Sequence, residues 1–493
     1  MNQPSLLNRL SRRDLFKTGA VSGLAAALGA CSRAKPVSLA KKTRSSQPWN
    51  VIFCVSDGMS MGIPSLAQPL SQRTRQCGTR WDQLMRDANT SHGLLATASL
   101  NSMVTDSAAA ASAWGSGSRV NNASLNTLPD GTALTPLAPL LRDAGKRVGL
   151  VTTDEICGAT PAGFAVCHAS RRAYDDIAPQ YLDTVDVLMG GGRNNFDTLA
   201  REDRRDLLHE FQQAGYLYCH QRGDVLAKPG APRMLGLFHG RKLPYTIDHR
   251  ENQAWRDQIP TLAEMTRSAI ASLQLGMQGF FLMVEGARID HAAHRNDIAS
   301  ALWDQLAFDD AVGVALDFAQ ARDDTLVIVA SDHGNSNPGL NGMGSTYDQS
   351  TACFDKLLGF KASFAHMRQT LKAQRQHSGD RVALAQDMIA QCTGLNLSGA
   401  QASVVSNALL DDQSLDGLNE QHHNWHGTLA QVLGNHTGIQ WTGVSHTADH
   451  VALAAVGPGS EDFVGLQHHT ELFPLITSYA GVSHVNPTAE AQV

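Results

Sequence analysis

The sequence predicts an α/β fold with a doubly wound, mostly parallel central sheet and helices on both faces. Three short apolar runs of strand length, at residues 51–55, 280–284 and 326–331, each lead into an acidic side chain. Uninterrupted apolar runs of this length are typical of parallel strands that are buried on both faces. Two further runs, at 148–153 and 185–189, each follow a plausible helix, and this alternation also indicates a parallel sheet.

The three runs end at Asp57, Glu285 and Asp332. Open α/β sheets bind ligands at the edge where the carboxyl ends of parallel strands meet, so these acids are expected to lie together. Neighbouring buried carboxylates repel one another and are costly to ionise unless cations lie among them. The pattern therefore predicts a metal site at the C-terminal ends of the strands.

Length and composition favour one large domain. The chain has 493 residues, of which 42% are hydrophobic and 17% charged, so it can bury an extensive core. The net charge is -6, and lysine and arginine are scattered along the chain rather than clustered. We therefore expect no nucleic-acid partner, because nucleic acids bind to surfaces on which lysine and arginine are clustered.

Residues 1–31 are typical of a twin-arginine export signal with a lipobox-like end. Arg12 and Arg13 precede a mildly apolar segment, residues 18–30, that is too short to span a bilayer comfortably. The segment ends in Leu-Gly-Ala followed by Cys31, which predicts lipidation of Cys31; simple cleavage near the same small residues is the alternative. We expect a flexible tether at 32–48, export to the periplasm or cell surface, and membrane association through the lipid anchor.

A helix is expected to begin at or near Ser107. Thr105, Asp106 and Ser107 are capping residues, and the four alanines that follow, at 108–111, are strong helix formers. The Ser107 hydroxyl would then lie at the positive end of the helix dipole, where anions bind. A plain capping serine is the alternative that this stretch alone leaves open.

Three separate groups of aspartate and histidine favour zinc-like ligation. Asp290 and His294 are four residues apart and would share one face of a helix, so both could bind one cation. Asp332 is followed by His333, and a third group at 445–450, which includes His446, precedes the apolar run at 451–456. A single histidine is more often an ordinary polar residue than a ligand, but three such groups at strand edges indicate a metal centre.

Taken together, these motifs resemble the alkaline phosphatase family over about residues 51–464. The resemblance is carried by Asp57-Gly58-Met59, Thr105-Asp106-Ser107-Ala108, Thr160-Pro161-Ala162, Arg171, Glu285-Gly286, Ile289-Asp290-His291, His294, Ala330-Ser331-Asp332-His333 and His446. It implies a catalytic domain at 49–485 that hydrolyses small phosphate monoesters through a phosphoserine intermediate, with two Zn²⁺ ions and one Mg²⁺ ion. A homodimer is a further possibility.

The resemblance also implies a role for individual residues. Ser107 would be the nucleophile, and Arg171 would clamp the phosphate. The metal ligands implied are Asp290, His294 and His446 for one zinc, Asp57, Asp332 and His333 for the other, and Asp57, Thr160 and Glu285 for magnesium. His291 would lie nearby without being a required ligand.

The sequence departs from the family pattern at Gly158. Many relatives have an acid or a histidine at this position, two residues before Thr160, so an outer-shell group of the magnesium site is missing. We expect a weak third metal site, unless a side chain from elsewhere fills the gap. Residues 339–440 are hard to align and are expected to contain a lid or crown insertion.

Two alternatives remain open at this point. The chain could be another hydrolase of the same superfamily, such as a phosphodiesterase, although diesterases there often use threonine as the nucleophile. It could also be a metal-binding surface lipoprotein without catalytic activity. A sulfatase is disfavoured because Ser107 lacks the Cys/Ser-x-Pro-x-Arg context.

Overall fold

The computed structural model describes residues 50–320, 322–375, 379–411 and 419–491. Every described residue belongs to one compact unit of the chain. The predicted export signal and tether therefore lie outside the described residues, as does Cys31. Among the described helices, none combines the length and the apolar character needed to cross a membrane.

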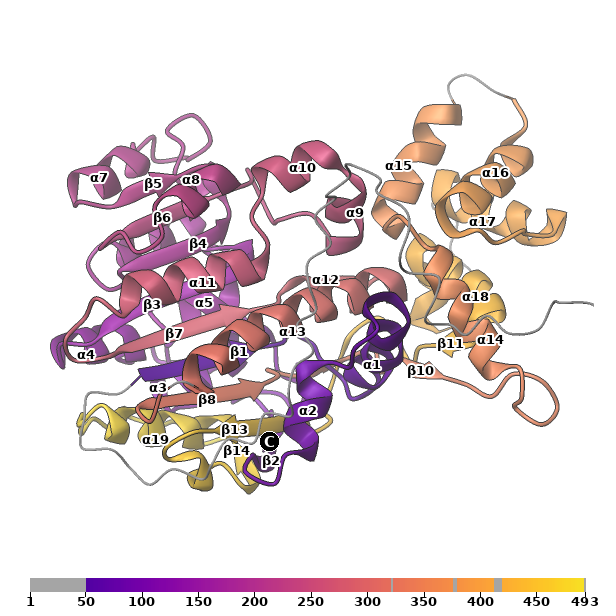
Figure 1. Ribbon diagram of the computed structural model, residues 1–493. Helices are drawn as coiled ribbons and strands as arrows, with labels where there is room; N and C mark the ends of the chain where they lie inside the picture. Colours follow the sequence, from indigo (N-terminus) through magenta and orange to yellow (C-terminus); the bar gives the residue numbers. More distant parts are fainter. Residues whose placement is uncertain (1–49, 321, 376–378, 412–418, 492–493) are drawn as a thin grey trace, which may run out of the picture. The chain divides into compact units, whose positions relative to one another are not determined.

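A ten-stranded sheet forms the centre of the described chain (Figure 1). Its strands lie in the order β14-β2-β13-β8-β1-β7-β3-β4-β6-β5. The strands are β1 (Asn50–Val55), β2 (Ser91–Ala96), β3 (Arg147–Glu155), β4 (Val187–Gly191), β5 (Leu217–Cys219), β6 (Met234–Leu237), β7 (Phe280–Glu285), β8 (Thr325–Ala330), β13 (Val451–Val456) and β14 (Gly465–His468). The strands predicted at 51–55, 280–284 and 326–331 are β1, β7 and β8. They are adjacent in the sheet, with β1 between β8 and β7.

The sheet is parallel except at β13, which runs antiparallel to both of its neighbours, β8 and β2. Leu453 of β13 pairs with Ala330, the last residue of β8. The amino end of β13 therefore lies at the carboxyl edge of the parallel strands. This reversal brings the segment before β13, including His446, to the edge where β1, β7 and β8 deliver their acids.

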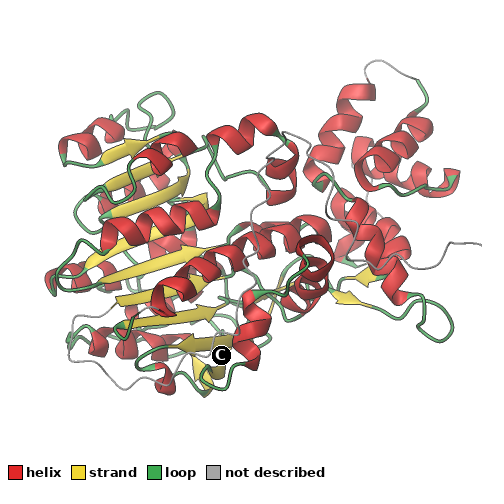
Figure 2. Cartoon of the chain, viewed as in Figure 1, coloured by secondary structure: helices red, strands yellow, loops and turns green. Residues whose placement is uncertain are grey.

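Helices cover both faces of the sheet (Figure 2), which confirms the predicted doubly wound α/β fold. Alternate residues of β1 enter separate apolar clusters: Ile52 and Cys54 join one, whereas Val51, Phe53 and Val55 join the other. The first cluster includes residues of α1 (Gly62–Arg75), α2 (Arg80–Arg86), α11 (Leu262–Leu273) and α13 (Ile298–Gln320). The second includes residues of α3 (Ser107–Ser116), α4 (Leu137–Asp143), α5 (Ala159–Gly163) and α19 (Leu472–Tyr479).

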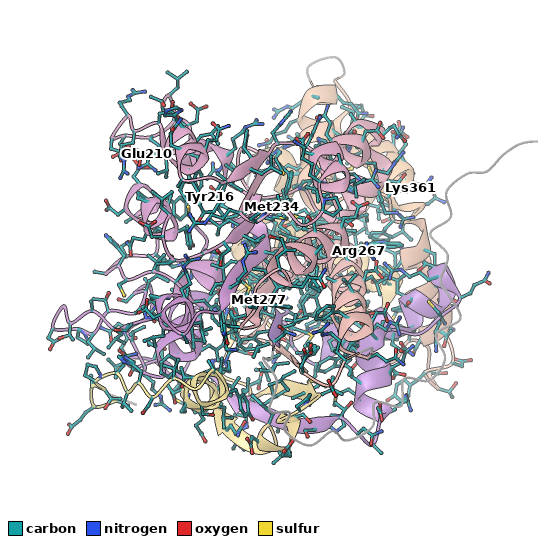
Figure 3. The ribbon with its side chains drawn as sticks, turned by 60° about the vertical axis from the view of Figure 1, so that its left-hand side comes forward. Glu210, Tyr216, Met234, Arg267, Met277 and Lys361 are labelled. Carbon is teal, nitrogen blue, oxygen red and sulfur yellow. The ribbon has the colours of Figure 1, made fainter. Side chains whose placement is uncertain are left out.

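The sheet stays buried toward its β5 end. Met234 begins β6 and is fully buried, whereas Met277, in the loop before β7, is 86% exposed (Figure 3). Tyr216, just before β5, is also buried, and its hydroxyl donates to the carbonyl of Leu182 at 2.9 Å. The other helices of this part are α6 (Tyr174–Ile177), α7 (Leu207–Gln213), α8 (Arg222–Ala227), α9 (Thr246–Glu251), α10 (Gln253–Gln258) and α12 (Arg288–Ala293).

The described part of residues 339–440, where the sequence predicts a lid or crown insertion, forms a helical insertion. Its ends meet in a two-stranded antiparallel pair, β10 (Gly339–Leu340) with β11 (Ile439–Gln440). Between them lie α14 (Ser350–Asp355), α15 (Phe364–Arg375), α16 (Arg381–Thr393), α17 (Gly399–Asp411) and α18 (Trp425–Thr437). The insertion is bonded to the rest of the fold, because the backbone N–H of Phe364 donates to Asp297 Oδ2 at 2.8 Å.

Candidate active site

Asp57 lies two residues after the end of β1 and is 5% exposed. Gly58 makes the turn after it with φ of +68°, and a Cβ there would lie 2.7 Å from Asp290 Oδ1, so only glycine fits this approach. Asp57 Oδ1 is buried, and none of the described residues forms a hydrogen bond with it. Burial and the charges of Asp332, Asp290 and Glu285 raise the pKa of Asp57 well above its ordinary value.

Glu285 ends β7 at the same edge, in register with Val55 of β1 and Thr152 of β3. The Thr152 hydroxyl donates a short hydrogen bond to Glu285 Oε2. Burial, followed by the charge of Asp154, raises the pKa of Glu285 to about 8. The hydroxyl of Thr160, in α5, is buried and has no hydrogen-bond partner among the described residues.

Asp332 and His333 follow β8, and both are fully buried. Asp332 Oδ1 accepts hydrogen bonds from the backbone N–H of Gly58 at 3.0 Å and of His333 at 2.9 Å. Asp332 Oδ2 has no hydrogen-bond partner in the part of the chain that the structure describes. It lies 3.2 Å from His333 Nε2, which is 3.6 Å from Asp57 Oδ1. Burial raises the pKa of Asp332 to about 6 and lowers that of His333 well below its ordinary value.

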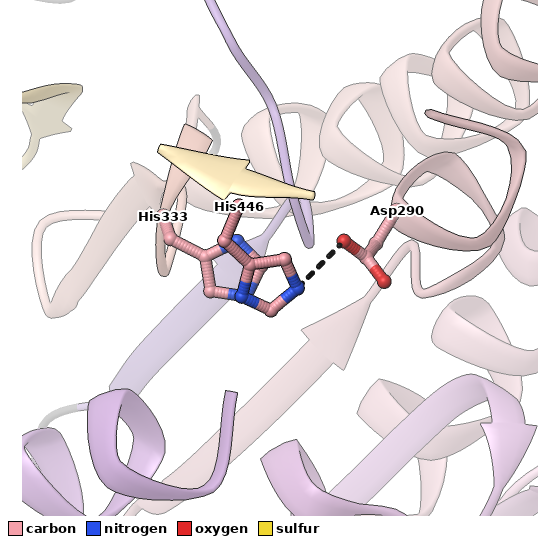
Figure 4. Close-up of side chains that lie close together, drawn as sticks. All are labelled: Asp290, His333 and His446. Carbon is pink, nitrogen blue, oxygen red and sulfur yellow. Dashed lines mark ion pairs between the residues drawn. The ribbon is translucent and has the colours of Figure 1, made fainter. Parts of the chain in front are cut away.

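A second group lies around Asp290. Helix α12 places Asp290 in its first turn, and its C-cap is His294, whose Nε2 is 3.4 Å from Asp290 Oδ2. His446 begins β12 (His446–Thr447), which pairs with β9 (Gly334–Asn335), and its Nε2 lies 3.5 Å from Asp290 Oδ1. Figure 4 shows the rings of His333 and His446 stacked beside Asp290, with ring centroids 3.6 Å apart. Burial opposes ionisation of Asp290, but the charges of these histidines lower its pKa.

The tautomers of His294 and His446 are fixed by backbone carbonyls, which can only accept hydrogen bonds. His294 Nδ1 lies 2.7 Å from the Val444 carbonyl oxygen, and His446 Nδ1 lies 2.9 Å from that of Thr105. Both Nδ1 atoms must therefore carry hydrogen, which leaves the Nε2 lone pairs available as ligands in the neutral rings. The two Nε2 atoms are 3.0 Å apart and face each other next to a carboxylate, an arrangement that a cation would stabilise.

Ser107 is the first residue of α3, as predicted, but it does not serve as the helix cap. Asp106 is the N-cap and accepts a hydrogen bond from the backbone N–H of Ala109 at 2.9 Å. The Ser107 hydroxyl is left free to reach His333 Nε2, at 3.1 Å. Asp106 also binds Arg171, whose Nη1 lies 2.8 Å from Asp106 Oδ2, so one carboxylate orients both the helix end and the guanidinium.

Sequence reasoning missed two residues that orient the site. Asp106 was identified only as a capping residue, and nothing in the motif indicated its bond to Arg171. Asn335 donates to Asp290 Oδ1 at 2.6 Å, and its position two residues after His333 was the only available signal. Both bonds fix the orientation of groups that the sequence did single out.

The donor set fits metal ions. Asp57, Asp332 and His333 place ligand atoms within 4.8 Å of one another, and so do Asp290, His333 and His446. His294 extends the second group, because its Nε2 contacts both Asp290 and His446. Unpaired buried polar atoms typically cost about 1–3 kcal/mol each, so the lone Asp57 Oδ1 and Asp332 Oδ2 are better explained as ligands. The sheet edge therefore gathers nearly all of the predicted donors.

The fold and the site together define a metal-binding enzyme of the doubly wound α/β class, with its centre at the carboxyl edge of the sheet. A buried serine at a helix start and an arginine beside it are typical of anion chemistry.

Comparison with known proteins identifies the family. Residues 49–482 match the sequence model of the alkaline phosphatase family. Alkaline phosphatase 3 of Bacillus subtilis is 32% identical over 449 residues, which cover 88% of this chain and 89% of that protein. Alkaline phosphatase 4 of Bacillus subtilis is 30% identical over 484 residues, which cover 96% and 97%. The crystal structure of Thermus thermophilus alkaline phosphatase matches with a TM-score of 0.83 and 32% identity, covering 92% of this chain and 96% of that one.

The chain therefore belongs to the alkaline phosphatase family and is a phosphatase enzyme. This confirms the resemblance and the fold class that the sequence motifs predicted.

Proposed function

We propose that the protein hydrolyses small phosphate monoesters through a phosphoserine on Ser107. The observation that carries this proposal is the Ser107 hydroxyl, which is 4% exposed and lies 3.1 Å from His333 Nε2, beside the two groups of metal donors. Because Asp106 caps α3, the Ser107 hydroxyl is not needed as the cap of that helix. Such a serine, with its hydroxyl beside an imidazole nitrogen in an acid-rich site, is best explained as a nucleophile.

We assign the metal ligands as the family resemblance implies. Asp290, His294 and His446 would hold one Zn²⁺, and Asp57, Asp332 and His333 the other. Mg²⁺ would be held by Asp57, Thr160 and Glu285. When bound, these ions supply the positive charge that a phosphate dianion requires and that favours an ionised serine oxygen. The unpartnered buried oxygens of Asp57, Asp332 and Thr160 support this assignment.

The chain's own residues then account for two displacements. Ser107 Oγ attacks phosphorus, so that the new serine O–P bond forms as the bond to the ester oxygen breaks and the alcohol leaves. Water attacks the phosphoserine in the second step, releasing inorganic phosphate and restoring the Ser107 hydroxyl. Arg171, anchored through Nη1 on Asp106, can donate its remaining N–H groups to the non-bridging oxygens and hold them in place.

We also propose export through the Arg12-Arg13 signal and a lipid anchor at Cys31, on the strength of the sequence pattern alone. The enzyme would then act in the periplasm or at the cell surface. A homodimer stays a prediction.

Hydrolysis of p-nitrophenyl phosphate by the purified protein tests the proposal. Exhaustive chelation should abolish turnover and added Zn²⁺ should restore it. Ser107→Ala should lose turnover while keeping its zinc content by elemental analysis, whereas Ser65→Ala, at an exposed serine of α1, should behave as wild type. Turnover that survives chelation would contradict the metal assignment, and faster hydrolysis of bis(p-nitrophenyl) phosphate would instead indicate a diesterase.

A further inference from the structure

The side chain of another residue lies beside the position where a side chain at Gly158 would begin. Gly158 caps α5, two residues before Thr160, and has no side chain to offer. A Cβ built on Gly158 would lie 3.1 Å from Asp154 Oδ2. A carboxylate from the end of β3 therefore stands where a side chain at position 158 would begin.

An irregularity in β3 explains how Asp154 reaches this place. The register between β3 and β4 shifts between Val151 and Glu155, and such bulges commonly re-aim a side chain next to an active site. The Thr152 hydroxyl accepts a hydrogen bond from the backbone N–H of Asp154 at 2.8 Å and donates one to Glu285. One threonine thus ties the Asp154 backbone to a proposed magnesium ligand.

The Asp154 carboxylate is held in place by charged and polar neighbours. Its side chain is 14% exposed, and Lys242 Nζ lies 3.6 Å from Oδ1. Oδ1 accepts a hydrogen bond from the backbone N–H of Glu155 at 2.7 Å, and Oδ2 lies 3.8 Å from His291 Nε2. Lys242 is itself fixed 2.6 Å from His291 Nε2. Burial opposes ionisation of Asp154, but the charges of His291 and Lys242 lower its pKa, so this half-buried carboxylate stays charged.

Asp154 also lies close to the proposed magnesium ligands. Its charge is the largest cause, after burial, of the raised pKa of Glu285. Thr160 is 1% exposed and Asp57 5% exposed, and each has a buried side-chain oxygen that no described residue contacts by a hydrogen bond. Three protein oxygens cannot complete the six-coordinate shell of Mg²⁺, so waters must supply the rest.

We propose that Asp154 is the positioning residue of the third metal site, where it accepts hydrogen bonds from the waters that complete the magnesium shell. It replaces the outer-shell side chain that is absent at Gly158, and Lys242 keeps its carboxylate in place. This inference rests on the magnesium site proposed above. It also implies that the third site is not weak, and that Gly158→Asp would crowd two carboxylates together rather than repair a gap.

Magnesium affinity measured apart from catalysis tests the inference. Zinc-loaded, magnesium-free protein is titrated with MgCl₂ in a calorimeter. Asp154→Asn keeps the side-chain oxygen that accepts from the Glu155 N–H but loses the charge, and it should weaken magnesium binding about tenfold to a hundredfold. Its zinc content and its melting temperature without magnesium should match wild type, and saturating magnesium should restore kcat. Asp183→Asn, at an exposed aspartate, is the matched control and should bind as wild type.

Three results would overturn the inference, and they have different meanings. If wild type binds no magnesium, the proposed magnesium site fails as well. If wild type binds magnesium and Asp154→Asn binds it within about twofold, Asp154 has no part in the site although the site stands. If Asp154→Asn melts at a lower temperature without magnesium, the titration is repeated with Asp154→Glu instead. This variant keeps the charge but moves the carboxylate outward by one methylene group. Unchanged magnesium affinity in that variant would then contradict the proposal.

Discussion

Removing the charge of Glu285 should stabilise the metal-free protein at high pH. Glu285 is 2% exposed, and its pKa is raised from 4.5 to about 8. Between these values the folded state holds a proton that the unfolded state has lost, so the free energy of unfolding falls as pH rises. One pKa unit is worth about 1.36 kcal/mol, so the full cost above pH 8 is about 5 kcal/mol.

Glu285→Gln avoids this cost and keeps an oxygen to accept the Thr152 hydrogen bond. In chelated samples, the variant should be more stable than wild type by about 4–5 kcal/mol at pH 9 and by less than about 1 kcal/mol at pH 5. Urea unfolding at both pH values measures the difference, and comparing two chains that differ at one side chain cancels the titration of the buried groups that do not interact with Glu285. Asp57 is an exception, because the charge of Glu285 raises its pKa, and its easier ionisation in the variant adds to the stabilisation at high pH. Glu202→Gln, at an exposed glutamate, is the control.

Bound metal should reverse the order of stability of the two proteins, because Glu285→Gln removes a proposed magnesium ligand. With zinc and magnesium present, wild type should be the more stable protein at pH 9. A difference between the chelated proteins that is the same at pH 5 and pH 9 would refute the reasoning, since it would mean that Glu285 does not hold its proton in the metal-free fold.

Two further predictions concern the phosphate clamp and the export signal. Arg171→Ala should lower kcat/KM for p-nitrophenyl phosphate by roughly tenfold to a hundredfold and weaken inhibition by inorganic phosphate, because charge-assisted hydrogen bonds are lost; unchanged phosphate inhibition would argue against the clamp. Changing Arg12 and Arg13 to lysine should trap the precursor in the cytoplasm, and Cys31→Ala should release the mature protein from the membrane fraction. Unaltered fractionation of Cys31→Ala would leave export standing without the lipid anchor.

The central strands could be predicted from the sequence because both faces of the sheet are covered. Residues 51–55 and 326–331 appear as continuous apolar runs since alternate side chains enter different cores. The acids that follow these runs then had to meet at one edge. The start of helix α3 could also be predicted, because Ser107 lies between capping residues and a run of alanines.

The rest of the site depends on tertiary structure that local patterns do not encode. The apolar run at 451–456 predicts a strand but does not indicate whether that strand is parallel or antiparallel to its neighbours. Its antiparallel pairing with β8 is what brings His446 to the metal donors. His333 contacts both groups of donors, which a sequence position cannot indicate. Asp154 could not be predicted as a site residue, because the shift in register between Val151 and Glu155 is not visible in the sequence pattern. That shift accompanies the position of its carboxylate beside Gly158.

The most direct test of the central claim is to look for phosphate on Ser107 during turnover. The enzyme is mixed with p-nitrophenyl phosphate, quenched in acid to preserve phosphoserine, digested, and examined by mass spectrometry. The account predicts phosphorylation of Ser107 in wild type and its absence in Ser107→Ala, together with loss of turnover. Full turnover by Ser107→Ala, or a quenched wild-type enzyme with the phosphate on another residue, would contradict it.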